Sequence, residues 1–271
     1  MWTKEAIKKR FDNFMGAKNL PQRKYFPNLF LKSNYFLPTK DTKPFFISCD
    51  NKKGFKELCV INNKNTRLFY SGHRCNMYDF WNYCLLLNKA KEEGTLELKI
   101  NGSDLMRLLG VSYGAKKIIV NSLFKMKDTS FYFIKDEFES DIFTLFSDFE
   151  YIKKDNGRTY INLSFKNSID YLLVDNFTYM GTSYLKKFKT NQTAIKFYSL
   201  LMTNKAWFYI TKDNLVNMCL ADINAKRQFL KSFYTRVLKP VEEAGAIHKW
   251  GKTKTNYYFL VGNKIHFKKR N

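Results

Sequence analysis

One predicted helix near the C-terminal end of this 271-residue sequence carries side chains that can read duplex DNA. When residues 223–243 are placed at helical spacing, an apolar stripe covers one side, and the other side carries Arg227, Gln228, Lys231, Thr235 and Lys239. Arginine can donate two hydrogen bonds to guanine, and glutamine can pair in the same way with adenine. We therefore expect the first four residues to read base pairs in a major groove and Lys239 to contact phosphate, although an ordinary solvated helix face has the same composition.

A second helix of the same design is predicted to begin at Tyr113. Its outward residues are Lys117, Asn121 and Lys125, and its inward residues are Ile119, Leu123 and Met126. We predict base readout by Lys117 and Asn121 and a phosphate contact by Lys125. Val120 and Phe124 lie on a third side of this helix, where core contact and a self-association surface both remain open.

Two basic turns accompany these helices. The later turn, Gly251–Thr255, carries Lys252 and Lys254 between two apolar runs. The earlier turn contains an Asn-Gly pair, a strong hairpin signal, flanked by Lys153, Lys154 and Arg158. Lysines on such a wing bind phosphates and set the register of a protein on DNA without reading its sequence, so we predict phosphate contacts for all five residues. The earlier turn is equally well explained as an ordinary solvated loop.

Residues for catalysis are not grouped in the sequence. His73, His248 and His266 stand alone, and the sequence has no glycine-rich phosphate-binding loop of the ATPase type. The acidic run 136–141 could bind a divalent metal, but a solvated or partner-facing patch explains it as well. We therefore predict no catalytic residue, no metal and no cofactor, and a protein that is not an enzyme.

The positions of these helices repeat along the chain. Residues 100–109 and residues 210–219 each run from an apolar strand residue through a polar cap into a short helix. The predicted caps are Asn101 and Thr211, and the following helices are expected to be capped by Ser112 and Asp222. A helix, a turn and a basic second helix form a helix-turn-helix, so the repeat predicts two DNA-binding domains.

Charge and composition agree with a nucleic-acid partner. The formal net charge is +23 with a pI near 9.7, which favours binding to a polyanion. Abundant Lys, Asn, Phe and Tyr also reflect an AT-rich coding sequence, so the placement of the charge matters more than its total. The five cysteines form no CxxC pair, and no stretch approaches the roughly 20 apolar residues that span a bilayer, so we expect a cytoplasmic protein without a membrane partner.

The order of predicted elements gives an α+β fold with two tandem winged-helix domains, each a helix-turn-helix with a β-hairpin wing. In both domains a helix and a strand precede the helix-turn-helix, and two strands follow it. The predicted segments are an irregular lead-in over residues 1–66, winged-helix domain 1 over 67–164, a connector over 165–189, winged-helix domain 2 over 190–262 and a basic tail over 263–271. Within the lead-in, a short helix over residues 2–15 is expected to pack on the body of the protein or on a partner, and residues 45–47 are expected to form a short strand.

The chain resembles the tandem winged-helix plasmid replication initiators, particularly their TrfA-type branch. The motifs that carry the resemblance lie between residues 67 and 262, and they are Phe69–Gly72, Met77–Trp81, Leu85–Lys91, Leu108–Gly110, Phe197–Leu201 and Leu238–Gly245. Their order and spacing are the specific feature, because each motif alone is common. The stretch from Met1 to Asn65 and the lysine-rich surface depart from the family pattern.

This resemblance implies a protein that binds double-stranded DNA at iterons, the repeated sites of a plasmid origin. It also implies opening of an adjacent AT-rich segment and recruitment of the host initiator and the replicative helicase. Members of the family commonly bind as monomers and are held inactive as dimers, so self-association as a dimer is left open. Two other interpretations remain: a transcriptional repressor with the same domains, and an origin-nicking enzyme of the relaxase or rolling-circle type.

Overall fold

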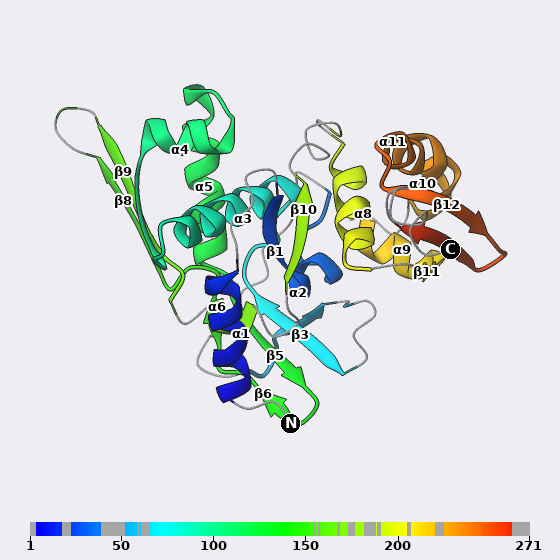
Figure 1. Ribbon diagram of the computed structural model, residues 1–271, viewed down its shortest axis with the longest axis horizontal. Coiled ribbons are helices and arrows are strands. Elements are labelled where there is room, and N and C mark those ends of the chain that lie inside the picture. The colour runs from blue at the N-terminus through cyan, green and yellow to red at the C-terminus, as the bar shows by residue number, and fades with distance from the viewer. Residues whose placement is uncertain are drawn as a thin grey trace.

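The computed structural model contains both helices and strands in the residues that it describes, which agrees with the α+β class (Figure 1). The predicted strand at 45–47, the cap Asp222, the wing residue Lys154 and the basic tail lie outside the described residues. The structure describes residues 4–17, 23–38, 52–58, 60, 65–153, 156, 158–166, 169–172, 177–181, 188, 191–204, 207–219 and 225–261.

The first unit, which we define as residues 77–164, contains a helix pair and a hairpin. The hairpin strands β8 and β9 form a three-stranded antiparallel sheet with β4, in the order β4-β9-β8. Leu98 and Ile100 of β4 lie opposite Leu163 and Ile161 of β9, which places apolar side chains together on the core face. The elements are α3 (Met77–Glu92), β4 (Glu97–Asn101), α4 (Gly102–Leu109), a 3-10 turn (Tyr113–Ala115), α5 (Lys116–Lys127), β8 (Asp148–Lys153) and β9 (Thr159–Ser164).

The second unit, residues 192–261, repeats this arrangement. Its sheet has the equivalent order, β11-β13-β12, and again the last strand lies between the other two. The starts of β11, α9 and α10 follow those of β4, α4 and α5 at one constant offset, as the sequence repeat predicts. The elements are α8 (Gln192–Met202), β11 (Trp207–Thr211), α9 (Lys212–Cys219), α10 (Lys226–Phe233), a π-helical segment (Tyr234–Leu238), α11 (Lys239–Glu243), β12 (Ile247–Lys252) and β13 (Asn256–Val261).

Two of the predicted helix caps are confirmed and one is wrong. The side-chain oxygen of Asn101 accepts a hydrogen bond from the Asp104 amide at 2.8 Å, and the Thr211 hydroxyl accepts one from the Asn214 amide at 3.1 Å. The Ser112 side chain makes no capping hydrogen bond. The chain enters α5 through the 3-10 turn, so Ala115, and not Ser112, is the residue that precedes the helix.

The predicted single helix over 223–243 is interrupted. Its apolar stripe is buried at Phe233, Val237 and Val241, as expected, but residues 234–238 form a π-helical turn. Pro240 has no amide hydrogen and cannot bond to the carbonyl of Arg236 four residues before it. The side-chain amide of Asn191 donates to that carbonyl at 2.5 Å, so the acceptor left by the proline is satisfied.

The first unit is also interrupted, between α5 and β8. The strand β5 (Ser130–Lys135) is not part of the hairpin sheet. It pairs with β3 (Thr66–Ser71) in a separate five-stranded sheet at the bottom of Figure 1. Its other strands are β2 (Lys56–Leu58), β6 (Phe138–Glu139) and β7 (Phe143–Thr144). Because of this insertion, the hairpin strands of the two units are not separated in the sequence by the constant offset that separates the helices.

The prediction of an irregular lead-in needs correction in its described part. The lead-in contains α1 (Lys4–Gly16), β1 (Arg23–Pro27) and α2 (Asn28–Lys32), and β1 pairs along its length with β10 (Phe177–Gly181) of the connector. The ring of Phe14 packs edge-on against Tyr25 and Phe177 at 5.4 Å, which confirms that α1 packs on the body of the protein. The helix α1 agrees with the helix predicted over residues 2–15, whereas β1 and α2 were not predicted, because each is only five residues long and they stand among prolines.

A buried lysine joins the second unit to the lead-in. Lys196 of α8 is only 1% exposed, and its ammonium donates hydrogen bonds to the carbonyls of Phe30 and Leu31 at 3.4 Å and of Ser33 at 2.5 Å. These carbonyls lie at the C-terminal end of α2, where the helix dipole favours a positive charge. Beside this contact, the Met77 amide of α3 donates to the side chain of Gln192 of α8 at 3.3 Å. The two units therefore share one hydrophobic core with the lead-in.

We expect Lys196→Met to lower the free energy of unfolding by about 1–3 kcal/mol, because buried carbonyls lose a charged donor. Urea denaturation followed by circular dichroism measures this change. Lys231→Met, at an exposed position of α10, is the matched control and should leave the midpoint unchanged. Equal midpoints for both variants would contradict a structural role for the Lys196 contact.

Candidate nucleic-acid interface

A basic groove lies between the helix α10 and the hairpin of the second unit. We define the basic groove by Lys212, Arg227, Lys231, Lys252 and Lys254, which surround a hollow of about 570 Å³ together with Leu230, Thr253 and Tyr257. Two predicted base-reading residues and the two predicted wing lysines are thus brought to one surface. The amphipathic character of α10 explains this placement, because Phe233 on its opposite side is buried in the core.

The charges of the basic groove are not neutralised by the protein. Within the described ranges, none of Arg227, Lys231, Lys252 and Lys254 forms an ion pair with a carboxylate. The neighbouring Lys226 differs, because its ammonium pairs with Asp213 of α9. A surface that keeps several uncompensated positive charges attracts a polyanion and releases its counterions on binding.

Lys212 fixes the position of the hairpin turn. Its ammonium donates to the carbonyls of Thr253 and Lys254 at 3.0 and 2.6 Å, and its backbone amide donates to the carbonyl of Thr255 at 2.9 Å. The turn is closed by a hydrogen bond from the Thr253 amide to the carbonyl of Asn256 at 2.9 Å. The wing lysines are therefore held at a set distance from α9. The sequence analysis missed this residue, whose only signal was its place at the start of a helix.

The remaining predicted readers of the second unit lie apart from the basic groove. Gln228 and Thr235 are exposed, but they line a different hollow of about 550 Å³ beside Asn191 and Arg236. The Thr235 hydroxyl donates to the carbonyl of Ser232 at 3.1 Å. Gln228 is turned about 100° from Arg227 around α10, so the polar face spans two hollows. The π-helical turn comes after both residues and changes the rotation per residue only from Tyr234 onward. Lys239 is exposed, and its ammonium nitrogen lies 3.9 Å from a carboxylate oxygen of Glu243.

The helix α5 of the first unit presents the expected polar face. Lys117, Asn121 and Lys125 are exposed, whereas Ile119, Leu123 and Met126 are buried. A buried hydrogen bond from the Ser122 hydroxyl to the Asp79 carboxylate fixes the rotation of α5 against α3. Asp79 also accepts a hydrogen bond from the Asn76 amide in a capping box at the start of α3.

The third side of α5 contacts the hairpin. Val120 is buried, and Phe124, although 43% exposed, packs edge-on against Phe149 of β8 with ring centroids 4.6 Å apart. Of the two interpretations left open by the sequence, core contact therefore accounts for Val120. For Phe124 the contact joins the helix to the wing strand.

The wing of the first unit is positioned differently from that of the second. Lys153 and Arg158 are exposed at the open ends of β8 and β9. At the start of α4, where the second unit has Lys212, the first unit has Gly102, and a Cβ atom there would lie 2.4 Å from the Thr159 hydroxyl oxygen. The glycine thus lets β9 approach the helix directly, whereas in the second unit a lysine side chain bridges to the wing.

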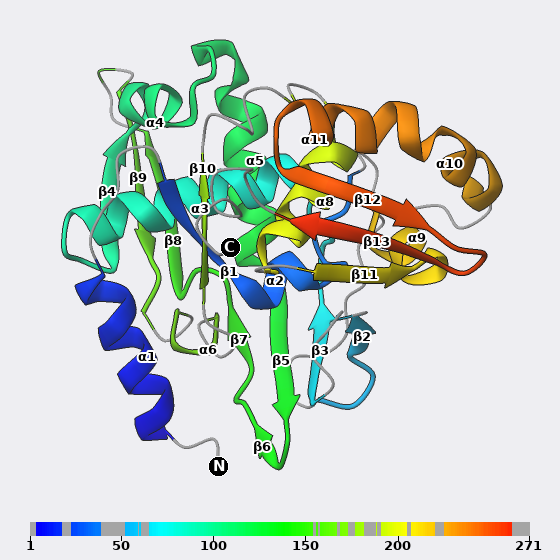
Figure 2. The ribbon, with the colours of Figure 1, turned by 45° about the vertical axis from the view of Figure 1, so that its right-hand side comes forward.

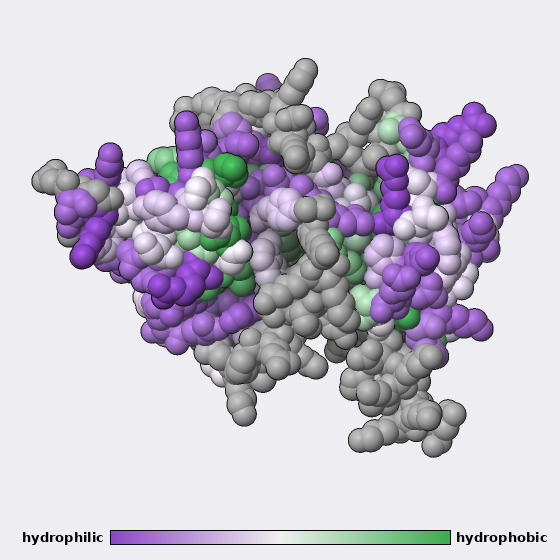
Figure 3. Space-filling view, turned by 90° about the horizontal axis from the view of Figure 1, so that it is seen from above, coloured by the Kyte–Doolittle hydropathy of each residue, from purple (hydrophilic) through white to green (hydrophobic). Residues whose placement is uncertain are grey.

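Helices of both units reach the same side of the molecule. Figures 1 and 2 place α4 of the first unit and α10 and α11 of the second along the upper side. Figure 3, which views the molecule from above, shows hydrophilic side chains gathered over both ends of this face. Arg227 and Lys117, whose burial would have excluded DNA contact, are both exposed.

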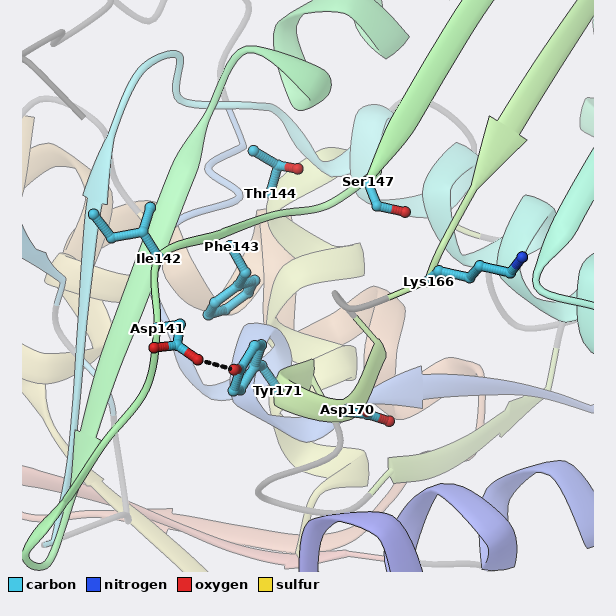
Figure 4. Close-up of a pocket in the computed structure, with 8 residues that line it drawn as sticks. All are labelled: Asp141, Ile142, Phe143, Thr144, Ser147, Lys166, Asp170 and Tyr171. Carbon is cyan, nitrogen blue, oxygen red and sulfur yellow. Dashed lines mark hydrogen bonds between the residues drawn. The ribbon is translucent and has the colours of Figure 1, made fainter. Parts of the chain in front are cut away.

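The acidic run 136–141 does not assemble a metal site in the described part of the chain. Asp141 accepts a hydrogen bond from the Tyr171 hydroxyl at 2.8 Å, and burial, assisted by this carboxylate, raises the pKa of Tyr171 to about 12. Asp141, Asp170 and Tyr171 line a hollow of about 480 Å³. In Figure 4, the Asp141 side chain points toward Tyr171, whereas the Asp170 side chain points away from both. No group of three possible ligands occurs among the residues that the structure describes.

No helix within the described residues combines the length and the apolar character needed to cross a bilayer.

Comparison with known proteins identifies the family of this chain. Residues 40–202, more than half of the chain, match the family model described as initiator replication protein, WH1. The chain belongs to this initiator replication protein family. No curated protein matches it.

Among solved structures, the crystal structure of domains 2–3 of RctB is similar to this chain. The TM-score is 0.52 at 13% sequence identity, and the match covers 90% of this chain and 100% of that chain. At this identity the similarity concerns the fold, and it extends over both units.

We expect Lys212→Met to release the wing of the second unit, because the carbonyls of Thr253 and Lys254 lose their shared donor at a cost of about 1 kcal/mol. Hydrogen exchange of the amides in residues 253–256 should become faster by about fivefold. Lys252→Met removes a charge from the same wing without removing this contact, so it should leave the exchange rates unchanged. Unchanged exchange in Lys212→Met would exclude a positioning role.

Proposed function

We propose that this protein is a replication initiator that binds double-stranded DNA at repeated sites of a plasmid origin through two winged-helix domains, residues 67–164 and 190–262. The observation that carries the proposal is the basic groove, in which Arg227 and Lys231 of α10 share one surface with Lys252 and Lys254 of the hairpin. A helix in a major groove beside a lysine-bearing wing on the phosphates is the geometry by which winged helices read DNA.

Two units in one chain favour a directly repeated or asymmetric site. A palindromic site matches the two-fold symmetry of a dimer, whereas the two units here are joined through Lys196 and the shared core without such symmetry. We propose that Lys117 and Asn121 read bases for the first unit, with Lys125, Lys153, Lys154 and Arg158 on phosphates. Gln228, Thr235 and Lys239 stay candidates in the second unit at the edge of the site.

We further propose that the protein is not itself an enzyme, and that the host initiator and replicative helicase supply the chemistry of replication. The family membership supports the initiator role, and no described feature favours strand nicking over DNA binding. A dimer that is inactive for DNA binding remains part of the proposal, as does a cytoplasmic location.

An electrophoretic mobility shift with DNA flanking the coding gene tests the proposal. We expect a complex that persists at about 150 mM salt and is displaced by the same DNA but not by a scrambled duplex. Equal competition by the scrambled duplex would exclude sequence recognition and show that the protein binds DNA only by attraction to the phosphates. A plasmid that carries the flanking DNA, with this gene as its sole replication gene, then distinguishes an initiator from a repressor. An initiator maintains this plasmid, whereas a repressor does not.

Variants of the basic groove separate base reading from phosphate binding. Arg227→Ala and Lys231→Ala should reduce discrimination between the specific and the scrambled duplex by about 1–3 kcal/mol each. Lys252→Ala and Lys254→Ala should weaken both duplexes alike and reduce the slope of log affinity against log salt by about 1 each. Lys226→Ala, whose charge is already paired with Asp213, is the control and should change neither quantity strongly. The reverse pattern would exchange the roles of helix and wing.

A further inference from the structure

One apolar side chain stands on the polar face of α5. Ile118, the third residue of this helix, is 71% exposed, more than any other large apolar side chain in the described ranges. The sequence analysis did not single it out, because it considered only the polar residues of the outward face.

The packing of the protein does not explain this isoleucine. Ile118 belongs neither to the buried cluster nor to the partly buried side chains that pack against it. A β-branched residue also loses rotamer freedom in a helix, so it gives α5 no local advantage over alanine or lysine. Single exposed apolar residues are common on protein surfaces, and the position of Ile118 is therefore the informative feature.

Ile118 lies on the face that the proposed function directs toward DNA. It directly follows Lys117 and precedes Asn121 by three residues and Lys125 by seven, and all three are exposed. Residues three and seven apart share one side of a helix. Ile118 is also in the first turns of α5, from which side chains of a reading helix reach base edges.

The second unit has a polar residue at the equivalent position. The constant offset between the two units matches Ile118 with Gln228, Lys117 with Arg227 and Asn121 with Lys231. Among these outward positions, only the one occupied by Ile118 changes from polar to apolar between the two units. The two reading helices therefore differ in chemistry at one defined place.

The major groove offers a single apolar group, the C5 methyl of thymine. We propose that Ile118 contacts this methyl group and makes the first unit specific for thymine at one position of its half of the site. The inference rests on the proposed function, since it requires that α5 enters the major groove. The second unit, with Gln228 at the matching position, has no such apolar contact.

Replacing thymine by deoxyuridine tests this contact, because it removes the methyl group and leaves base pairing unchanged. The specific duplex is first selected from a randomised pool, and each thymine is then replaced singly. We expect the affinity of the wild-type protein to fall about fourfold at one thymine, the value for one methyl group removed from water.

The variants identify the side chain responsible. Ile118→Ala should bind the thymine duplex about fourfold more weakly than wild type and should not distinguish thymine from deoxyuridine at that position. Ile118→Val should keep most of the discrimination. Val111→Ala, which removes an exposed apolar side chain outside α5, is the matched control and should keep all of it.

The outcomes separate this inference from the proposed function. If the wild-type protein prefers the selected duplex over a scrambled one but tolerates deoxyuridine at every position, the methyl contact is excluded and the proposed function stands. If Ile118→Ala keeps the wild-type response to deoxyuridine, another residue reads the methyl group and the inference is wrong. If no duplex is preferred, the proposed function fails and the inference fails with it.

Discussion

A buried charge, the ammonium group of Lys196, helps to hold the second unit on the lead-in. A charged side chain that is 1% exposed would be costly without partners, and here three carbonyls at the end of α2 supply them. Because α2 belongs to the lead-in and α8 begins the second unit, this contact and the shared hydrophobic core together fix the position of the second unit on the lead-in. Under the proposed function, the same packing would set the spacing between the two helices that read DNA.

The two units show how one architecture accommodates different local solutions. In the first unit, Gly102 lets β9 approach the start of α4, while in the second Lys212 bridges the equivalent gap to the hairpin turn. In the second unit, α11 contains Pro240, and Asn191 satisfies the carbonyl that the proline leaves unbonded. Each difference keeps the hairpin or the helix in place, although the residues that do so are unrelated.

Local sequence patterns predicted the repeated part of the fold well. Caps such as Asn101 and apolar spacing such as Ile119 and Leu123 act within a few residues, so they can be read from the sequence. Pairing between β1 and β10 joins segments that lie far apart in the chain, and no local signal specifies it. The π-helical turn before Pro240 was not predicted, because the effect of the proline on helical hydrogen bonding was not considered. For the candidate site, amphipathic spacing and a turn signal were enough to choose Arg227, Lys231, Lys252 and Lys254, which the structure brings to one surface. Lys212 was not recognised, because the contact by which it holds the turn is visible only in three dimensions. Ile118 was passed over because only polar residues of the outward helix face were considered, and its exposure came from the structure.

The family match and the folded structure begin at different residues, because β1, which pairs with β10, lies before the match. The match begins at residue 40, yet Tyr25, Phe30 and Phe36 are fully enclosed and contact aromatic rings of later segments. A fragment trimmed to start at the match would leave β10 without its partner strand and uncover an aromatic surface. Residues 23–38 are thus part of the folded core, and shortened versions of the protein for crystallisation or binding experiments should retain them.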